Sequence, residues 1–332
     1  MRHQTRVTGE QNDPMSSIGL VLGAGGLTGQ AFHAGVLAGI AEHTGWDPAS
    51  ADLVVGTSAG AGMGTYLRLG ITPADMLARL EGAPLSPTGQ AVVDRFGEPG
   101  DWTRPTVARE WRPPHPQLLG KLLRTPWRVR PEALLGVAIP TGRMDTELWT
   151  AAIRAGAGNI WPTAALWICA VRMDDAHRVV FGREGAPHTD VATAVGASSA
   201  IPGYFAPVTI HGRRYVDGGV HSPTNADVVR NEALDLVIVS SPMSISNNAT
   251  LHKPSRALRG HFRARLGVET RKLRRAGRSV RVFQPSEADL RVMGNQAMDN
   301  DRMAAVARQA RETTVRRLGE RPLELGRAAA AS

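Results

Sequence analysis

Short apolar runs alternate along the chain with longer segments in which apolar residues recur every three or four positions. The runs indicate buried strands, and the periodic segments indicate helices that pack by one face. Predicted strands cover residues 18–22, 52–55, 165–172, 178–181, 213–217, 234–240 and 279–283. Predicted helices cover residues 30–43, 59–69, 73–81, 145–155, 189–199, 224–231, 258–275 and 300–318. This alternation predicts an α/β fold of three layers, α/β/α, with a mainly parallel central sheet.

The length of 332 residues is sufficient for one large α/β core. We expect a single domain over residues 18–320, preceded by a flexible leader at residues 1–17 and followed by a flexible tail at residues 321–332. Residues 82–142 are rich in Trp, Pro and Arg. Because proline disfavours regular structure, this stretch is predicted to be an insertion or a cap.

A serine, Ser58, lies at the centre of the sequence Gly-Thr-Ser-Ala-Gly at residues 56–60, directly after the second predicted strand. A strand, a tight turn and a helix in this order form a nucleophile elbow, which presents a serine hydroxyl beside a helix N-terminus. The turn strains its central residue, and only small neighbours such as Gly56, Ala59 and Gly60 let the strand and the helix approach. Taken alone, the motif also fits an ordinary Ser/Gly turn.

A glycine-rich segment, Gly-Ala-Gly-Gly-Leu-Thr-Gly at residues 23–29, joins the first predicted strand to the first predicted helix. Glycines at such a junction leave backbone N–H groups uncovered, and these groups bind a phosphate or the oxyanion of a tetrahedral intermediate. A dinucleotide fingerprint is the competing interpretation. Thr28, however, occupies the position of its third glycine, and no acidic residue ends the next strand.

The third segment is Val216-Asp217-Gly218-Gly219, in which Asp217 ends a short predicted strand. The glycines that follow let the backbone turn sharply. A carboxylate at one strand end can reach a serine at a neighbouring strand end. Alone, an Asp-Gly-Gly sequence is more typical of a plain turn, so the segment gains meaning only beside the other two.

Together, and in this order, the three segments resemble the patatin-like phospholipase family. The resemblance covers about residues 18–240, and it includes residues 197–208, which are similar to the family's stretch before its catalytic aspartate. It implies a patatin-like fold and a serine acyl hydrolase that cleaves carboxylic esters of lipids. The reaction would pass through an acyl-enzyme intermediate and would use neither a metal nor an organic cofactor.

The resemblance also implies roles for individual residues. Ser58 would be the nucleophile, and Asp217 would be the general base of a dyad that contains no histidine. Backbone N–H groups of Gly25, Gly26 and Leu27 would hold the oxyanion. The other motif residues would shape the turns around these groups: Gly23, Gly29, Gly56, Thr57, Ala59, Gly60, Gly218 and Gly219.

Several alternatives stay open. Thr28 stands where the family usually has Arg or Lys, which puts a preference for phospholipid over neutral esters in doubt. A histidine-dependent triad is another possibility, because His221, His252 and His261 all follow Asp217 in the chain order of conventional hydrolases. The same fold could also serve an acyltransferase that uses the acyl-serine, or a catalytically weak lipid-binding or regulatory protein.

Positive charge is concentrated in residues 253–281, which contain eleven Lys or Arg residues and a single acid. The resulting +10 exceeds the +9 of the whole chain. The arginines recur at helical spacing beside part of an apolar stripe, made by Leu258, Phe262, Leu266 and Leu273. A basic amphipathic helix of this kind can bind an anionic membrane, face solvent or contact nucleic acid. No nucleic-acid-binding motif accompanies it, so nucleic acid is not expected as a partner.

The remaining features narrow the class of protein. The sequence has no run of about eighteen apolar residues, the length needed to span a membrane as a helix. Cys169, the single cysteine, lies in an apolar run and is most simply a core residue. No Cys/His cluster has metal-ligand spacing, so no metal site is expected. We therefore expect a cytoplasmic enzyme, with peripheral membrane binding left open.

Overall fold

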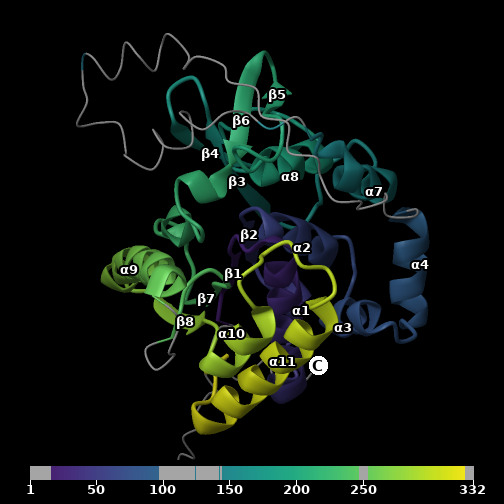
Figure 1. Ribbon diagram of the computed structural model, residues 1–332, viewed down its shortest axis with the longest axis vertical. Helices are drawn as coiled ribbons and strands as arrows, with labels where there is room; N and C mark the ends of the chain where they lie inside the picture. Colours follow the sequence, from purple (N-terminus) through teal and green to yellow (C-terminus); the bar gives the residue numbers. More distant parts are fainter. Residues whose placement is uncertain (1–15, 97–123, 125–141, 143, 247–252, 326–332) are drawn as a thin grey trace, which may run out of the picture.

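The computed structural model of the chain describes residues 16–96, 124, 142, 144–246 and 253–325. The described residues form one mixed sheet of eight strands in the order β5-β6-β3-β2-β1-β7-β8, with β4 paired to β3 (Figure 1). The strands are β1 (Ile18–Leu22), β2 (Leu53–Gly56), β3 (Leu166–Arg172), β4 (His177–Phe181), β5 (Val208–Ile210), β6 (Arg213–Asp217), β7 (Leu236–Ser240) and β8 (Ser279–Phe283). Strands β3, β2, β1, β7 and β8 run parallel, whereas β4 and β6 run antiparallel to β3.

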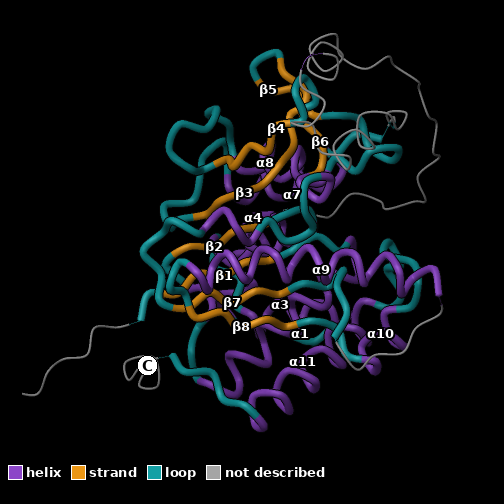
Figure 2. Tube along the Cα trace, turned by 90° about the vertical axis from the view of Figure 1, so that its left-hand side faces the viewer, coloured by secondary structure: helices purple, strands orange, loops and turns teal. Residues whose placement is uncertain are grey.

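Helices surround this sheet (Figure 2). They are α1 (Gly26–Thr44), α2 (Ala59–Arg68), α3 (Pro73–Glu81), α4 (Pro87–Phe96), α7 (Glu147–Ala157), α8 (Val191–Ser199), α9 (Lys253–Arg275), α10 (Glu287–Met293) and α11 (Met303–Glu320). Two short 3-10 turns, η3 (Gly218–Val220) and η4 (Ala226–Val229), follow β6. The fold is thus α/β, with a mainly parallel central sheet flanked by helices, as the sequence pattern predicts.

The two faces of the sheet are covered unequally. Alternate residues of β1 divide between them: Leu20 and Leu22 join one hydrophobic cluster, and Val21 joins the other. Helices α1, α2, α8 and α11 are among those that close the larger cluster, whereas α9 and η4 close the smaller one. Burial on both faces explains why the strands read as continuous apolar runs in the sequence.

Helices α1 and α11 pack with their backbones in contact. A Cβ atom added to Gly35 would lie 2.1 Å from the carbonyl oxygen of Ala307, and one added to Gly39 would lie 2.9 Å from the Cβ atom of Thr314. Only glycine fits at these two positions of α1. The contact fixes the helix that begins in the glycine-rich segment at residues 23–29.

All seven predicted strands are confirmed, with ends that shift by at most two residues, and β5 is an additional short strand. Helix α1 begins at Gly26, four residues before the predicted start, so the expected glycine-rich loop is partly the first helical turn. Helix α10 was not predicted, although Ser286 and Asp289 form a capping box at its start, which is a recognisable N-terminal signal.

One predicted helix was wrong. The helix predicted at residues 224–231 is only the 3-10 turn η4, because Asn225 adopts a left-handed conformation (φ 50°) that starts no α-helix. Part of the tract at residues 82–142 forms α4, a helix that was not predicted and whose Val92 and Phe96 are buried in the core. The tryptophans of this tract lie outside the described residues.

The predicted basic helix exists as α9, but its apolar stripe is divided. Leu266 and Leu273 are buried against the sheet, whereas Leu258 is 55% exposed. Within the described part of the chain, no helix combines the length and the apolar character that crossing a membrane requires.

Candidate active site

Ser58 and Asp217 meet because β2 and β6 end on the same side of β3. Strand β2 runs parallel to β3, and its last residue, Gly56, pairs with Ile168. Strand β6 runs antiparallel to β3, and its last residue, Asp217, pairs with Ala170. Because β4 occupies the other side of β3 at both positions, the C-terminal ends of β2 and β6 face each other along β3.

The turn after β2 has the geometry of a nucleophile elbow. Ser58 has φ 54° and ψ −119°, a strained conformation for a residue with a side chain. A Cβ atom on Gly60 would lie 2.0 Å from the carbonyl oxygen of Leu22, and one on Gly56 would lie 2.5 Å from the Cα atom of Ala61. The two glycines therefore let α2 begin directly against the strands, with Ser58 at its N-terminus.

Ser198, at the end of α8, holds this turn in place. The backbone N–H of Ser58 donates to the Ser198 hydroxyl at 2.9 Å, and that hydroxyl donates to the carbonyl of Cys169 at 2.7 Å. These two hydrogen bonds connect the elbow to β3. Sequence reasoning included Ser198 in a family-like stretch but gave it no role, because the contact joins residues 140 positions apart.

Asp217 is buried, with 5% of its surface exposed. The backbone N–H of Gly219 donates to its Oδ1 atom at 2.6 Å, and the Ser58 side chain is its other hydrogen-bond partner. Burial raises the pKa of Asp217 to about 6, although these two hydrogen bonds act in the opposite direction. The carboxylate is therefore ionised at neutral pH but is a stronger base than an ordinary aspartate.

The glycine-rich segment supplies free backbone donors at the start of α1. Among the described residues, the N–H groups of Gly25, Gly26 and Leu27 have no hydrogen-bond acceptor. Gly26 has φ 63°, which favours glycine, and a Cβ atom there would lie 2.7 Å from the carbonyl oxygen of Ala297. These N–H groups belong to a helix N-terminus, where the macrodipole favours negative charge.

Two residues of α1 brace this segment. His33 is fully buried: its Nε2 atom donates to the carbonyl of Gly23 at 2.7 Å, and its Nδ1 atom accepts from the Ser240 hydroxyl at 2.8 Å. Burial lowers the pKa of His33 to about 4, so the ring is neutral at pH 7. Thr28 is also buried, and both its N–H and its hydroxyl donate to the carbonyl of Ala297. Thr28 stands where the family usually has Arg or Lys, and its side chain here contacts the segment after α10.

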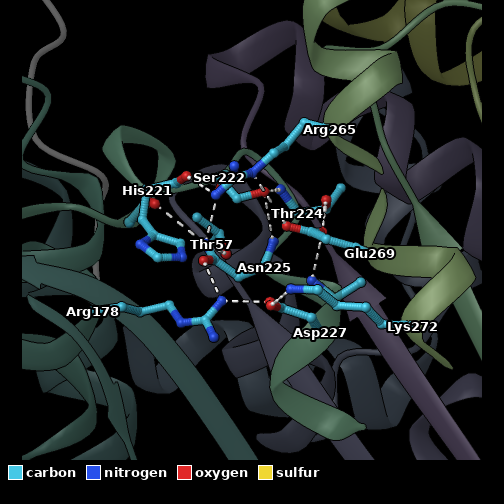
Figure 3. Close-up of polar contacts among 12 residues, drawn as sticks. Thr57, Arg178, His221, Ser222, Thr224, Asn225, Asp227, Arg265, Glu269 and Lys272 are labelled. Atoms are coloured by element: carbon cyan, nitrogen blue, oxygen red, sulfur yellow. Dashed lines mark hydrogen bonds and ion pairs between the residues drawn. The ribbon is translucent and has the colours of Figure 1, made fainter. Parts of the chain in front are cut away.

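The side chain of Asn225 connects the elbow to the Asp-Gly-Gly turn by hydrogen bonds (Figure 3). Its Nδ2 atom donates to Thr57 Oγ1 and to the carbonyl of Gly218, both at 3.2 Å, and to the carbonyl of Ser222 at 2.7 Å. The side chain is fully buried. Sequence reasoning missed Asn225, which supports both candidate catalytic residues without touching either.

A charged cluster continues from Asn225 toward α9 (Figure 3). Arg178 donates to Asn225 Oδ1 and pairs with Asp227 at 2.5 Å, and Lys272 of α9 pairs with the same carboxylate at 3.0 Å. Burial alone would raise the pKa of Asp227, but Arg178 and Lys272 outweigh it and hold the pKa at about 2. Glu269 of α9 is buried beside this cluster.

The hydrogen bonds to Glu269 come from uncharged groups, and Arg265 lies 4.0 Å from its carboxylate. Glu269 accepts a hydrogen bond from the Thr224 hydroxyl at 2.6 Å and one from the backbone N–H of Ala226 at 2.9 Å. Burial raises the pKa of Glu269. Through Glu269 and Lys272, α9 is therefore anchored to the segment that carries Asn225.

The other candidates contribute less. Cys169 is a buried free thiol, and burial raises its pKa to about 12. Across the described ranges, no group of three His, Cys, Asp or Glu side chains is placed to hold a metal ion. His261 lies on α9 against Phe262, and His252 is outside the described residues.

Comparison with known families decides the identity. The family model described as patatin-like phospholipase matches residues 20–230, which include the glycine-rich segment, the elbow and the Asp-Gly-Gly turn. The chain belongs to the patatin-like phospholipase family. The resemblance noted in the sequence is thereby confirmed. This is a family of carboxylic ester hydrolases.

Solved structures of two bacterial proteins are similar to this patatin-like chain. VipD from Legionella pneumophila matches with a TM-score of 0.46 and 15% identity, over 92% of this chain and 67% of VipD. The type III effector protein ExoU matches with a TM-score of 0.39 and 16% identity, over 94% of this chain and 54% of ExoU. In the complex of ExoU with SpcU from Pseudomonas aeruginosa, the values are 0.37, 17%, 93% and 52%. The chain thus spans about half the length of ExoU.

Proposed function

We propose that the protein is a serine acyl hydrolase in which Ser58 attacks the carbonyl carbon of a lipid ester and Asp217 acts as the general base. One observation carries this proposal: the Ser58 side chain hydrogen-bonds the buried Asp217 carboxylate where β2 and β6 face each other. A carboxylate with a pKa near 6 is largely ionised at neutral pH and still basic enough to take the serine proton.

The reaction proceeds in two halves. Ser58 Oγ bonds to the carbonyl carbon while its proton passes to Asp217, and a tetrahedral oxyanion forms. The intermediate then collapses, the bond to the alcohol oxygen breaks, and Asp217 returns the proton to the departing alcohol. In the second half, water attacks the acyl-enzyme as Asp217 takes a proton from it. The acid then leaves, and Ser58 regains the proton.

The oxyanion in both halves is stabilised by the N–H groups of Gly25, Gly26 and Leu27. Their freedom from other acceptors and their position at the start of α1 support this role. The N-terminus of α2, directly after Ser58, adds a second helix dipole of the same sign. Loss of one such donor typically lowers the rate by about 10²–10³.

The alternatives differ in what accepts the acyl group or in whether it is transferred at all. No feature of the described residues favours an alcohol over water as the acceptor, so hydrolysis is the function that we propose. A protein that only binds lipid would form no covalent acyl-serine. Labelling of the nucleophile therefore separates the catalytic proposal from the binding alternative.

The test is a fluorophosphonate probe followed by mass mapping of the labelled peptide. We expect the label on Ser58, and we expect Ser58→Ala to lose both labelling and hydrolysis of a short-chain p-nitrophenyl ester. Ser50→Ala is the matched control, because Ser50 is an exposed serine just before β2. Wild-type activity in the Ser58→Ala protein would show that the nucleophile lies elsewhere.

A histidine-dependent triad is tested by His221→Ala. If Asp217 is the base, this variant keeps activity within about tenfold of wild type. A His221→Ala protein without activity would support the triad instead. His221 is the right residue to change because it follows η3, four positions after Asp217.

We also propose that α9 contacts anionic membranes. Leu258 and Val268 are 55% and 41% exposed, and Arg271 and Arg275 are exposed on the same helix. Arg271→Gln/Arg275→Gln should reduce co-sedimentation with anionic vesicles and leave hydrolysis of a soluble ester unchanged. If both forms fail to pellet with neutral and anionic vesicles alike, α9 has no such role.

A further inference from the structure

A cavity of about 620 Å³ lies between α9, β8 and the C-terminal end of α11. Strand β8 is the last strand in the sheet order, so the cavity is at the sheet edge away from β5 and β6. Its volume is in the range of small-molecule sites, which is about 300–1,000 Å³. Nothing in the proposed hydrolysis uses this part of the molecule.

The charge of the cavity lining is strongly positive. Its charged residues are Arg263 and Arg274 of α9, Arg281 of β8, Arg317 and Glu320 of α11, and Arg321. Five arginines therefore face one glutamate, an excess of four positive charges. We call these five arginines the arginine cluster.

The cluster lacks the acidic partners that cations elsewhere on α9 have. On the opposite flank of α9, Lys272 pairs with Asp227 at 3.0 Å, and Arg265 lies 4.0 Å from Glu269. Within the described ranges, none of the five arginines of the cluster forms an ion pair with Asp or Glu. The same helix thus presents neutralised cations on one side and uncompensated cations on the other.

Backbone carbonyls hold three members of the cluster. Arg274 donates from Nη2 to the carbonyl of Val280 at 3.4 Å. Arg317 donates from Nη1 to the carbonyl of Gln284 at 2.6 Å, and Arg281 donates from Nη2 to the carbonyl of Arg321. A guanidinium group has five N–H donors, so one bond to a carbonyl orients the group and leaves most donors available. The pKa of Arg281 is lowered, first by burial and then by the charges of Arg321 and Arg317. Such mutual repulsion is relieved when an anion binds between the groups.

We propose that the arginine cluster is a binding site for a small ligand that carries two or more phosphate groups. Guanidinium groups bind phosphate oxygens through paired, charge-assisted hydrogen bonds, and several arginines around one cavity match several phosphates. The shared chemistry is a free polyphosphorylated molecule or a lipid headgroup with more than one phosphate. The proposal does not depend on Ser58, because it concerns binding and not turnover.

The first arm of the test is isothermal titration of the full chain with inositol hexakisphosphate and with pyrophosphate. We expect binding that weakens with salt, and an affinity about tenfold or more lower in Arg281→Gln/Arg317→Gln. Arg263→Gln/Arg274→Gln is the second variant, since both residues are exposed and we expect their replacement to leave the fold intact. Arg291→Gln is the matched control, because Arg291 is 73% exposed and pairs with Glu287 outside the cavity.

The second arm identifies the source of the phosphates. Vesicles that contain cardiolipin, which has two phosphates, are compared with phosphatidylglycerol vesicles of equal total charge. Preferential pelleting with cardiolipin that is lost in the cluster variants assigns the site to a lipid headgroup. Binding of the soluble probes with no preference between the vesicles assigns it to a free molecule.

Three results would overturn the proposal. The first is that neither soluble probe nor cardiolipin binds. The second is binding that is equal in wild type, the cluster variants and Arg291→Gln. The third is tighter binding of a short single-stranded oligonucleotide than of either phosphate probe, which would indicate a nucleic-acid surface. Because no ester is cleaved in these measurements, a failed hydrolase assay does not affect them.

Discussion

Asp217 and Asp227 lie ten positions apart in the chain, both largely buried, and their surroundings drive their pKa values in opposite directions. Around Asp217 the partners are a hydroxyl and a backbone amide, and burial raises the pKa to about 6. Around Asp227 they are Arg178 and Lys272, which outweigh burial and hold the pKa at about 2. The comparison teaches that a nearby cation, more than burial, decides whether a carboxylate here is a base or a structural anion.

The structure also keeps the candidate base Asp217 apart from the ion pairs of Asp227. Asn225 stands between the regions, with its Nδ2 atom on the side of Thr57 and Gly218 and its Oδ1 atom accepting from Arg178. The uncharged amide of Asn225 links the two regions by hydrogen bonds and places no positive charge beside Asp217. A cation in the place of Asn225 would lower the pKa of the candidate base and weaken it.

The largest expected effect comes from making the same substitution in both regions. Asp217→Asn should lower kcat by about 10³ or more, because an amide cannot accept the serine proton. Asp227→Asn, the matched control, should keep kcat within about tenfold but lower the melting temperature, since Arg178 and Lys272 lose their carboxylate. Steady-state kinetics with a soluble ester measures both. Equal loss of activity in the two variants would contradict the division of roles.

The pH dependence of activity should report Asp217 alone. A base must be unprotonated, so kcat/KM should be half of its plateau near pH 6 and about 100-fold below it at pH 4. In Asp227→Asn the profile should keep this midpoint, because Asp227 stays ionised throughout this range. Initial rates between pH 4 and pH 8 give the midpoint. A midpoint near pH 4 would mean that burial does not raise the pKa of the base.

Stability should respond with opposite signs in the two regions. The folded-state pKa of Asp217 lies above its ordinary value of 3.8, so its contribution to stability is full below about pH 4 and is lost as the pH rises through 6. Asp217→Asn should therefore be more stable than wild type at pH 8, by up to about 3 kcal/mol, and not at pH 4.

Asp227 has the reverse sign. Its folded-state pKa lies below 3.8, so its stabilisation is present above about pH 4 and is lost as the pH falls toward 2. Asp227→Asn should thus be less stable than wild type at pH 8. Urea unfolding of both variants at pH 4 and pH 8 checks the two signs, and a shift in the same direction at pH 8 would refute the comparison.

The smallest effect concerns the residue between the regions. Asn225→Gly keeps the left-handed backbone and removes the side chain, and it should lower kcat/KM by about tenfold as the elbow and the Asp-Gly-Gly turn lose their connection. Asn225→Ala should be less stable than Asn225→Gly, because alanine is strained at φ 50°. Kinetics and thermal melts separate the two contributions. Wild-type kcat/KM in Asn225→Gly would show that Asn225 has no positioning role.

Sequence reasoning reached the strands because burial on both faces gives them uninterrupted apolar runs. It failed at residues 224–231, where Ala226, Val228 and Val229 have helical spacing but the left-handed Asn225 limits the segment to one 3-10 turn. It also missed α10, whose capping box was present in the sequence, and α4, which lies in a proline-rich tract.

At the site, three motifs taken together selected Ser58, Asp217 and the glycines as candidates, and the fold brings Ser58 and Asp217 together. The residues that support the elbow could not be predicted from the sequence, because Ser198 and Asn225 contact it from 140 and 168 positions away. The opposite pKa shifts of Asp217 and Asp227 could not be predicted from the sequence either. It depends on Arg178 and Lys272, which come from β4 and α9 and carry no local sign of their partner.

The backbone contact between α1 and α11 sets a limit on where the chain can be shortened. The family match ends at residue 230, yet α11 begins at Met303 and rests directly on Gly35 and Gly39 of the helix that carries the proposed oxyanion donors. A fragment cut at the end of the family match would leave those glycines against water and expose the apolar side of α1. A fragment that keeps the packing of α1 must therefore extend beyond the family match and include α11.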